Sequence, residues 1–190
     1  MEKKMKKLAV FFPGIGYTVD KPLMHYSRRL AAESGFEIRL LPYSGFPDKI
    51  KGDREKMDEC YRIALAQAIE MLSEVDFSSY DEILFVGKSI GTIVAAVIAT
   101  ESSVPDRIHF VLYTPLEDTF AFPLGHAIVF TGSADPWVRE GIIPELCQKA
   151  DIPCRIIENS DHSLETGDVK EDIRIMKKIM KKTRKFIREI

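Results

Sequence analysis

Residues 84–92, with the sequence LFVGKSIGT, place Ser89 between two glycines where an apolar strand gives way to an apolar helix. A serine hydroxyl attacks carbonyl carbons once a base removes its proton, and a sharp strand-to-helix turn would expose this hydroxyl. Gly87 and Gly91 would leave the space that such a strained turn needs. The turn would also put the N–H of Ile90 at a helix start, where it could stabilise an oxyanion. An ordinary tight turn is the alternative, so the chemistry requires a base and an acid elsewhere.

The base must be one of four histidines. His162, in the segment ENSDHSLE, follows the last expected strand and precedes the last expected helix. Its loop would therefore lie at the carboxyl edge of a parallel sheet, the same edge as Ser89. His25, His109 and His126 fall in a helix, inside a strand and just before a strand, and we expect packing or turn roles for them. His162 is the predicted base.

The acid should also follow a strand, and Asp135 is the single acid in TGSADPWV, residues 131–138. An Asp-Pro pair can instead cap a helix and open its first turn, which is the structural alternative. Glu117 or Asp118, after the preceding strand, are competing candidates for the acid. We expect Asp161, beside His162, to be solvated.

The pattern of apolar residues predicts six strands and five helices in alternation. The expected strands cover residues 7–12, 37–41, 82–86, 108–113, 127–131 and 154–158. The expected helices cover residues 21–33, a long segment capped by Asp53 and reaching residue 75, 89–101, 137–149 and 169 to the end. Gly141 and Pro144 could divide the fourth helix. The inward face of the last helix is expected at Val169, Ile173, Met176, Met180 and Ile187.

Several expected strands are continuously apolar, as in ILFV and AIVF, which is typical of strands buried on both faces. Strands of this kind, alternating with helices, indicate a mostly parallel sheet covered by helices on both sides. The 190 residues are enough for one sizeable core, so residues 1–190 are predicted to form a single α/β domain.

The order Ser89, Asp135, His162, each in a loop after a strand, resembles the α/β-hydrolase superfamily along essentially the whole chain. The resemblance implies a three-layer sandwich and a serine hydrolase whose nucleophile, acid and base are these three residues. It also implies a second oxyanion donor in FFPGIGYT, after the first strand, where Pro13 replaces the usual histidine. By position this donor would be the N–H of Ile15, with that of Gly16 as the alternative. Extra amino-terminal strands and a long insertion between residues 113 and 127 are missing, so no cap domain is expected.

Some other residues could line a pocket near these loops, although each also has a purely structural explanation. They are Gly14, Gly16, Tyr17, Lys88 and Trp137. The three cysteines lack metal-ligand spacing, so no metal is expected, and the resemblance requires no cofactor. Nucleotide binding is not expected, because the segment after the first strand lacks the third glycine of a dinucleotide fingerprint and Glu82 stands where a P-loop needs glycine.

The net charge of −2 gives no general attraction to nucleic acids or to membranes, and the basic stripe of the last helix complements its dipole. The apolar run at residues 8–12 is too short for a signal peptide, and the sparse cysteines fit a cytoplasmic protein. We therefore predict a cytoplasmic hydrolase of small esters or thioesters, whose partner is a small acyl substrate. The alternatives are a binding protein without turnover, and a peptidase or lactonase that uses the same residues.

Overall fold

The computed structural model describes residues 5–50 and 52–190, and residues 1–4 of the basic amino-terminal stretch lie outside this description. Six parallel strands form one sheet in the order β2-β1-β3-β4-β5-β6. The strands are β1 (Lys7–Phe12), β2 (Phe36–Leu40), β3 (Glu82–Lys88), β4 (Ile108–Tyr113), β5 (Ala127–Gly132) and β6 (Cys154–Ile157). The helices are α1 (Pro22–Glu33), α2 (Arg54–Leu72), α3 (Ile90–Thr100), α4 (Ile142–Lys149) and α5 (Val169–Arg188). Short 3-10 turns lie at η1 (Phe77–Ser79), η2 (Pro105–Arg107) and η3 (Glu117–Ala121).

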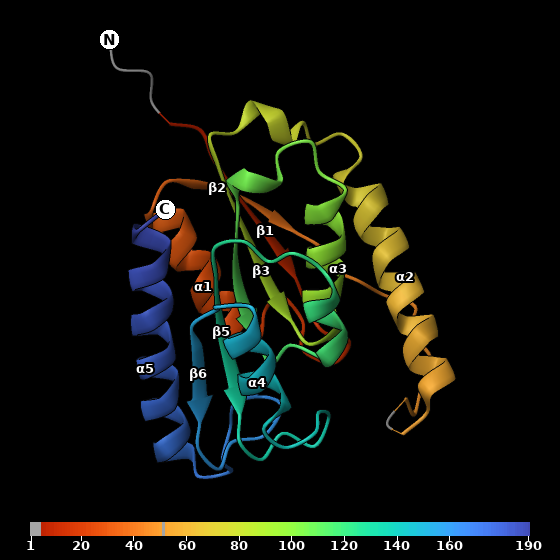
Figure 1. Cartoon of the computed structure of the whole chain (residues 1–190), viewed down its shortest axis with the longest axis vertical. Helices are drawn as coiled ribbons and strands as arrows, with labels where there is room; N and C mark the ends of the chain where they lie inside the picture. Colours follow the sequence, from red (N-terminus) through yellow and green to blue (C-terminus); the bar gives the residue numbers. More distant parts are fainter. Residues whose placement is uncertain (1–4, 51) are drawn as a thin grey trace.

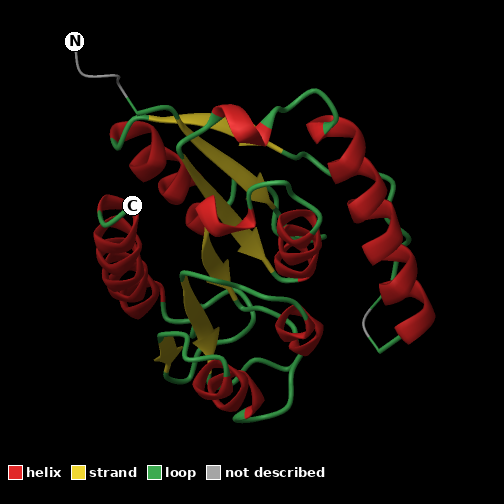
Figure 2. Ribbon diagram, turned by 45° about the horizontal axis from the view of Figure 1, so that its top comes forward, coloured by secondary structure: helices red, strands yellow, loops and turns green. Residues whose placement is uncertain are grey.

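The helices cover both faces of the sheet (Figure 1). α1 and α5 pack on one face, while α2, α3 and α4 pack on the other, as the second view also shows (Figure 2). Each face has its own cluster of fully buried side chains. The predicted three-layer α/β sandwich with a parallel six-stranded sheet is confirmed.

Local sequence explains why the helices start where they do. Asp53 caps α2 by accepting a hydrogen bond from the N–H of Lys56 at 3.1 Å, as expected. Asp168 caps α5 in the same way through Glu171 at 2.9 Å. The segment of β-branched residues after Ser89 is helical, because α3 lies between the sheet and α2 and buries both sides of its surface.

The fourth helix is shorter than predicted. It begins at Ile142 rather than at residue 137, so Asp135 and Pro136 do not open a helix. Gly141 has a φ of 74°, a left-handed conformation that interrupts a right-handed helix at this point. Trp137 lies in the loop before α4, where its backbone N–H donates a hydrogen bond to the Asp135 side chain.

The inward face of α5 was predicted wrongly for two residues, because Val169 and Ile173 are 73% and 65% exposed. Ile175, Ile179, Thr183 and Phe186 are buried instead. Thr183 contributes through a buried hydrogen bond of 2.7 Å with the hydroxyl of Tyr113. A pattern of apolar residues does not reveal a buried polar contact of this kind.

The segment between β4 and β5 holds only the short η3 turn, so this segment forms no cap domain, as expected. Across residues 5–50 and 52–190, no helix is both long enough and apolar enough to cross a membrane.

Candidate functional site

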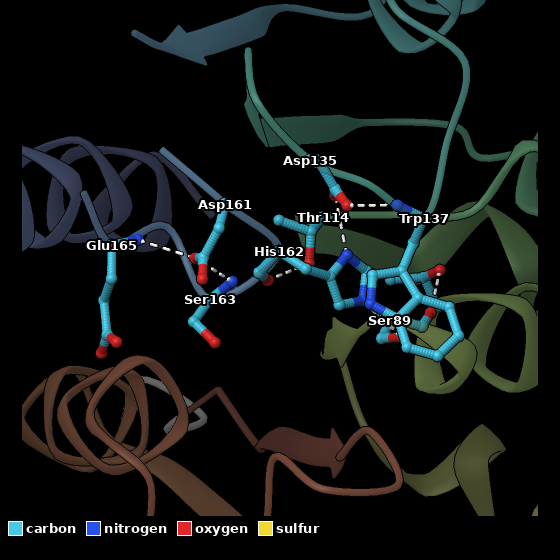
Figure 3. Close-up of polar contacts among 9 residues, drawn as sticks. Ser89, Thr114, Asp135, Trp137, Asp161, His162, Ser163 and Glu165 are labelled. Atoms are coloured by element: carbon cyan, nitrogen blue, oxygen red, sulfur yellow. Dashed lines mark hydrogen bonds and ion pairs between the residues drawn. The ribbon is translucent and has the colours of Figure 1, made fainter. Parts of the chain in front are cut away.

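The loops after β3, β5 and β6 bring Ser89, Asp135 and His162 together (Figure 3). His162 Nε2 lies 2.8 Å from Ser89 Oγ, and His162 Nδ1 lies 2.7 Å from Asp135 Oδ2. With the carboxylate ionised, Nδ1 donates to Asp135 and Nε2 accepts from the serine hydroxyl. Residues separated by up to 73 positions thus form one continuous chain of hydrogen bonds.

Ser89 occupies a strained backbone conformation, with φ 54° and ψ −126°. This turn exists because glycines surround it. A Cβ on Gly91 would overlap the carbonyl oxygen of Phe12, and a Cβ on Gly87 would lie 2.9 Å from Thr92 Cα. The ends of β1 and β3 can therefore pack closely against the first turn of α3 on either side of Ser89, where the predicted elbow needs glycines.

The loop after β1 also reaches this turn. A Cβ on Gly14 would lie 3.3 Å from Ser89 Cβ, so this loop passes directly beside the hydroxyl. Ile15 follows Gly14 in the loop. Ile90 is the first residue of α3, where a backbone N–H lacks an intrahelical acceptor. Both predicted oxyanion donors therefore belong to segments that adjoin Ser89.

Asp135 is the acid that contacts His162, and its side chain is fully buried. Its second oxygen, Oδ1, accepts from the N–H of Trp137 at 2.9 Å, which fixes the carboxylate plane. The competing acids lie elsewhere. Glu117 pairs with Arg139 at 3.6 Å, and Asp118 is exposed.

The His162 loop is held by contacts that sequence reasoning missed. Thr114 Oγ1 donates to the carbonyl of His162 at 3.1 Å, and the backbone of Thr114 has a positive φ of 41°. Asp161, which was expected to be solvated, is exposed and also accepts from the N–H groups of Ser163 and Glu165. No motif marks Thr114, since its role depends on where β4 ends beside the loop after β6.

Burial lowers the pKa of His162, because an imidazolium is poorly solvated in this position. The hydrogen bond to Asp135 acts in the opposite direction and raises the pKa. The nearby charge of Lys88 lowers it again, and the net pKa lies below the ordinary value for histidine. A neutral imidazole is the form that can accept a proton from Ser89.

The residues predicted to line a pocket differ in how far they are exposed. Gly14, Tyr17 and Lys88 are buried, Gly16 is exposed, and the ring of Trp137 lies 5.6 Å from that of His162. A cavity of about 350 Å³ beside the first turn of α3 has other walls. They are Met57, Asp58, Tyr61, Ile90, Ile93, Leu116, Asp118, Ala121 and Phe122. Sequence reasoning did not identify this cavity, because its walls come from α2, α3 and η3 together.

Within the part of the chain that the structure describes, no group of three or more histidine, cysteine or acidic side chains is arranged to hold a metal ion.

Solved structures with the same architecture are found at low sequence identity. A lidless α/β serine hydrolase from Xanthomonas campestris is 12% identical, with a TM-score of 0.61 over 99% of this chain and 84% of its own. A serine hydrolase homologue from Coxiella burnetii is 14% identical, with a TM-score of 0.61 over 96% of this chain and 86% of its own. A thermophilic esterase from Thermogutta terrifontis is 17% identical, with a TM-score of 0.63 over 97% of this chain and 84% of its own. No family profile and no curated protein sequence matches the chain. The chain therefore has the α/β-hydrolase fold, which the resemblance of its sequence predicted.

Proposed function

We propose that this protein is a serine hydrolase that cleaves a small carboxylic ester or thioester through an acyl-enzyme intermediate. The observation that supports this most strongly is the hydrogen-bonded chain from Ser89 through His162 to Asp135, with distances of 2.8 and 2.7 Å. Similarity to esterase structures at 12–17% identity supports the fold, whereas the reaction rests on this geometry.

In the first half of the reaction, Ser89 Oγ attacks the carbonyl carbon of the substrate while His162 Nε2 takes the hydroxyl proton. Asp135 stabilises the resulting imidazolium through Nδ1. The carbonyl oxygen becomes an oxyanion, for which the N–H groups of Ile90 and Ile15 are the proposed donors. The imidazolium then returns its proton to the leaving alcohol or thiol, and the acyl group remains on Ser89.

In the second half, a water molecule attacks the acyl-enzyme and gives its proton to His162. Collapse of this second oxyanion breaks the bond to Ser89 Oγ, which recovers the proton from the imidazolium. The products are a carboxylic acid and the free enzyme, and the reaction needs neither a metal nor an organic cofactor.

The cavity beside Ile90 supports an apolar acyl group as the preferred substrate. Its walls are mainly aliphatic and aromatic, and its volume of about 350 Å³ lies at the small end of ligand sites. Asp58 and Asp118 are the charged groups at its rim, so an acyl chain that ends in a carboxylate would be repelled.

The test is hydrolysis of p-nitrophenyl acetate by the wild-type protein and by Ser89→Ala. We expect the variant to lose measurable turnover, because no other group supplies the nucleophile. Ser103→Ala is a matched control, since Ser103 is exposed beyond the carboxyl end of α3, the end far from Ser89. If Ser89→Ala retained the wild-type rate, the assignment of the nucleophile would be wrong.

A fluorophosphonate probe separates this proposal from a binding protein without turnover, because the probe requires a reactive serine. A folded protein whose Ser89 did not react would favour the binding protein. Comparison of esters with lactones and peptides would separate the esterase from the lactonase and the peptidase. A small acyl substrate and a cytoplasmic location remain part of the proposal.

A further inference from the structure

Lys88 is a buried lysine directly before Ser89, and it is only 1% exposed. Lys88 is two residues after Val86 in β3 and shares its face of the sheet, so its side chain points to the face that α1 and α5 cover. Lysine is almost never fully buried without a partner, because its ammonium loses hydration. Among the described residues none accepts a hydrogen bond from Nζ, which lies 5.1 Å from the centre of the Tyr17 ring.

Tyr17 holds this ammonium from the loop after β1. Its hydroxyl accepts from the N–H of Leu23 at 3.1 Å, which fixes the ring at the start of α1. Tyr17 Cβ lies near Gly14 and therefore near Ser89. Lys88, which precedes Ser89, and Tyr17 therefore form a cation–ring pair next to the strained serine turn.

Two loops contribute charged groups that act on this pair: Asp135 follows β5, and Asp161 and Glu165 follow β6. Burial lowers the pKa of Lys88 to about 7, against the opposing effect of the Asp135 and Asp161 carboxylates. Burial also raises the pKa of Tyr17 to about 12, with smaller contributions from Glu165 and Asp161. The buried tyrosine of β4, Tyr113, has a raised pKa and remains neutral.

The charge on Lys88 acts on the imidazole of His162. The titratable groups that bear on His162 are Asp135, Asp161 and Lys88, and of these only Lys88 lowers its pKa. Lys88 becomes positively charged as the pH falls below about 7, the range in which an ordinary histidine would also be protonated. Two positive charges in the same buried site repel each other, so a charged Lys88 opposes protonation of His162.

We propose that Lys88 is a positioning residue of this site, whose buried ammonium keeps the His162 imidazole neutral and able to accept the Ser89 proton. The role of the imidazole as a base rests on the proposed function, but the effect of Lys88 on its protonation does not. The alternative is that the lysine stem only fills space, as an apolar side chain of similar volume would.

The experiment measures the pKa of His162 by NMR titration in the wild-type protein and in Lys88→Met. His162→Gln identifies the His162 resonance among the four histidines. We expect the pKa of His162 to rise by roughly half to one pH unit in Lys88→Met. In the pH profile of kcat/KM for p-nitrophenyl acetate, the apparent pKa on the acid side should rise by the same amount. Lys88→Arg, which keeps the charge, should stay close to the wild-type value.

An unchanged His162 pKa in Lys88→Met would overturn the proposal and leave space filling as the role of the side chain. If Lys88→Met did not fold, Lys88→Gln also removes the charge while keeping a polar side chain, and the same rise in the His162 pKa is expected. An unchanged His162 pKa in Lys88→Gln would overturn the proposal as well. Neither titration requires turnover, so a failure of the hydrolase proposal in the Ser89→Ala assay is a separate result.

Discussion

Gly132, the last residue of β5, allows the His162 loop to approach Asp135. Its φ is not in the left-handed region, so Gly132→Ala changes only the space that the residue occupies. The added Cβ would overlap the carbonyl oxygen of Ser160 and lie 2.6 Å from that of Asp161. Both oxygens belong to backbone immediately before His162, so the loop itself must move.

The displacement can be estimated from these contacts. Ordinary van der Waals contact begins near 3.4 Å, so the loop at Asp161 must retreat by about 0.8 Å or more. A misplacement of about 1 Å can reduce the rate of an enzyme by about 100-fold. Overpacking of this kind also costs about 1–3 kcal/mol of the free energy of unfolding. We therefore expect Gly132→Ala to fold, with a lower Tm and about 100-fold lower kcat/KM.

The assay combines p-nitrophenyl acetate kinetics with circular dichroism and thermal unfolding. Gly16→Ala is the matched control for stability, because its added methyl group meets no atom within 4 Å. A Gly132→Ala protein with wild-type kcat/KM and Tm would refute the reasoning, since it would mean that the loop is not packed against the end of β5.

Three further predictions address the acid, the cavity and the buried lysine. Asp135→Asn should lower kcat for p-nitrophenyl acetate by about 10³–10⁴-fold, while Asp118→Asn changes it by less than about threefold; the reverse order would reassign the acid. Ile93→Phe should fill part of the cavity and lower kcat/KM for p-nitrophenyl hexanoate about tenfold relative to acetate, whereas equal effects on both esters would show that the acyl chain lies elsewhere. The pKa of Lys88 is about 7 in the folded protein and 10.5 in the unfolded chain. Between these two pH values the unfolded chain therefore holds more protons than the folded protein. The free energy of unfolding should therefore rise by about 2 kcal/mol from pH 7 to pH 9 in the wild-type protein, and this rise should be absent in Lys88→Met by urea titration.

The order of elements could be predicted from the sequence because the strands are buried on both faces and read as continuous apolar runs. Parallel strands then bring their carboxyl ends to one edge, which places the loops of Ser89, Asp135 and His162 together before any distance is known. The strained turn at Ser89 was predictable too, since only glycines fit beside it.

Other features depend on packing between distant segments, which a local pattern does not encode. Thr114 reaches the His162 carbonyl only because β4 ends beside the loop after β6. α4 starts after the left-handed Gly141, and α5 makes a buried hydrogen bond to β4 between Thr183 and Tyr113. Lys88 is buried beside the ring of the distant Tyr17, whereas a lysine in an exposed turn would look identical in sequence.

The most direct measurement is peptide mass spectrometry of the protein after reaction with a fluorophosphonate. Activation of Ser89 by His162 predicts a single adduct on the peptide that contains Ser89, formed at a rate that falls by at least about 10³-fold in His162→Ala. Modification of a different residue, or an equal rate of Ser89 modification in His162→Ala, would contradict the account.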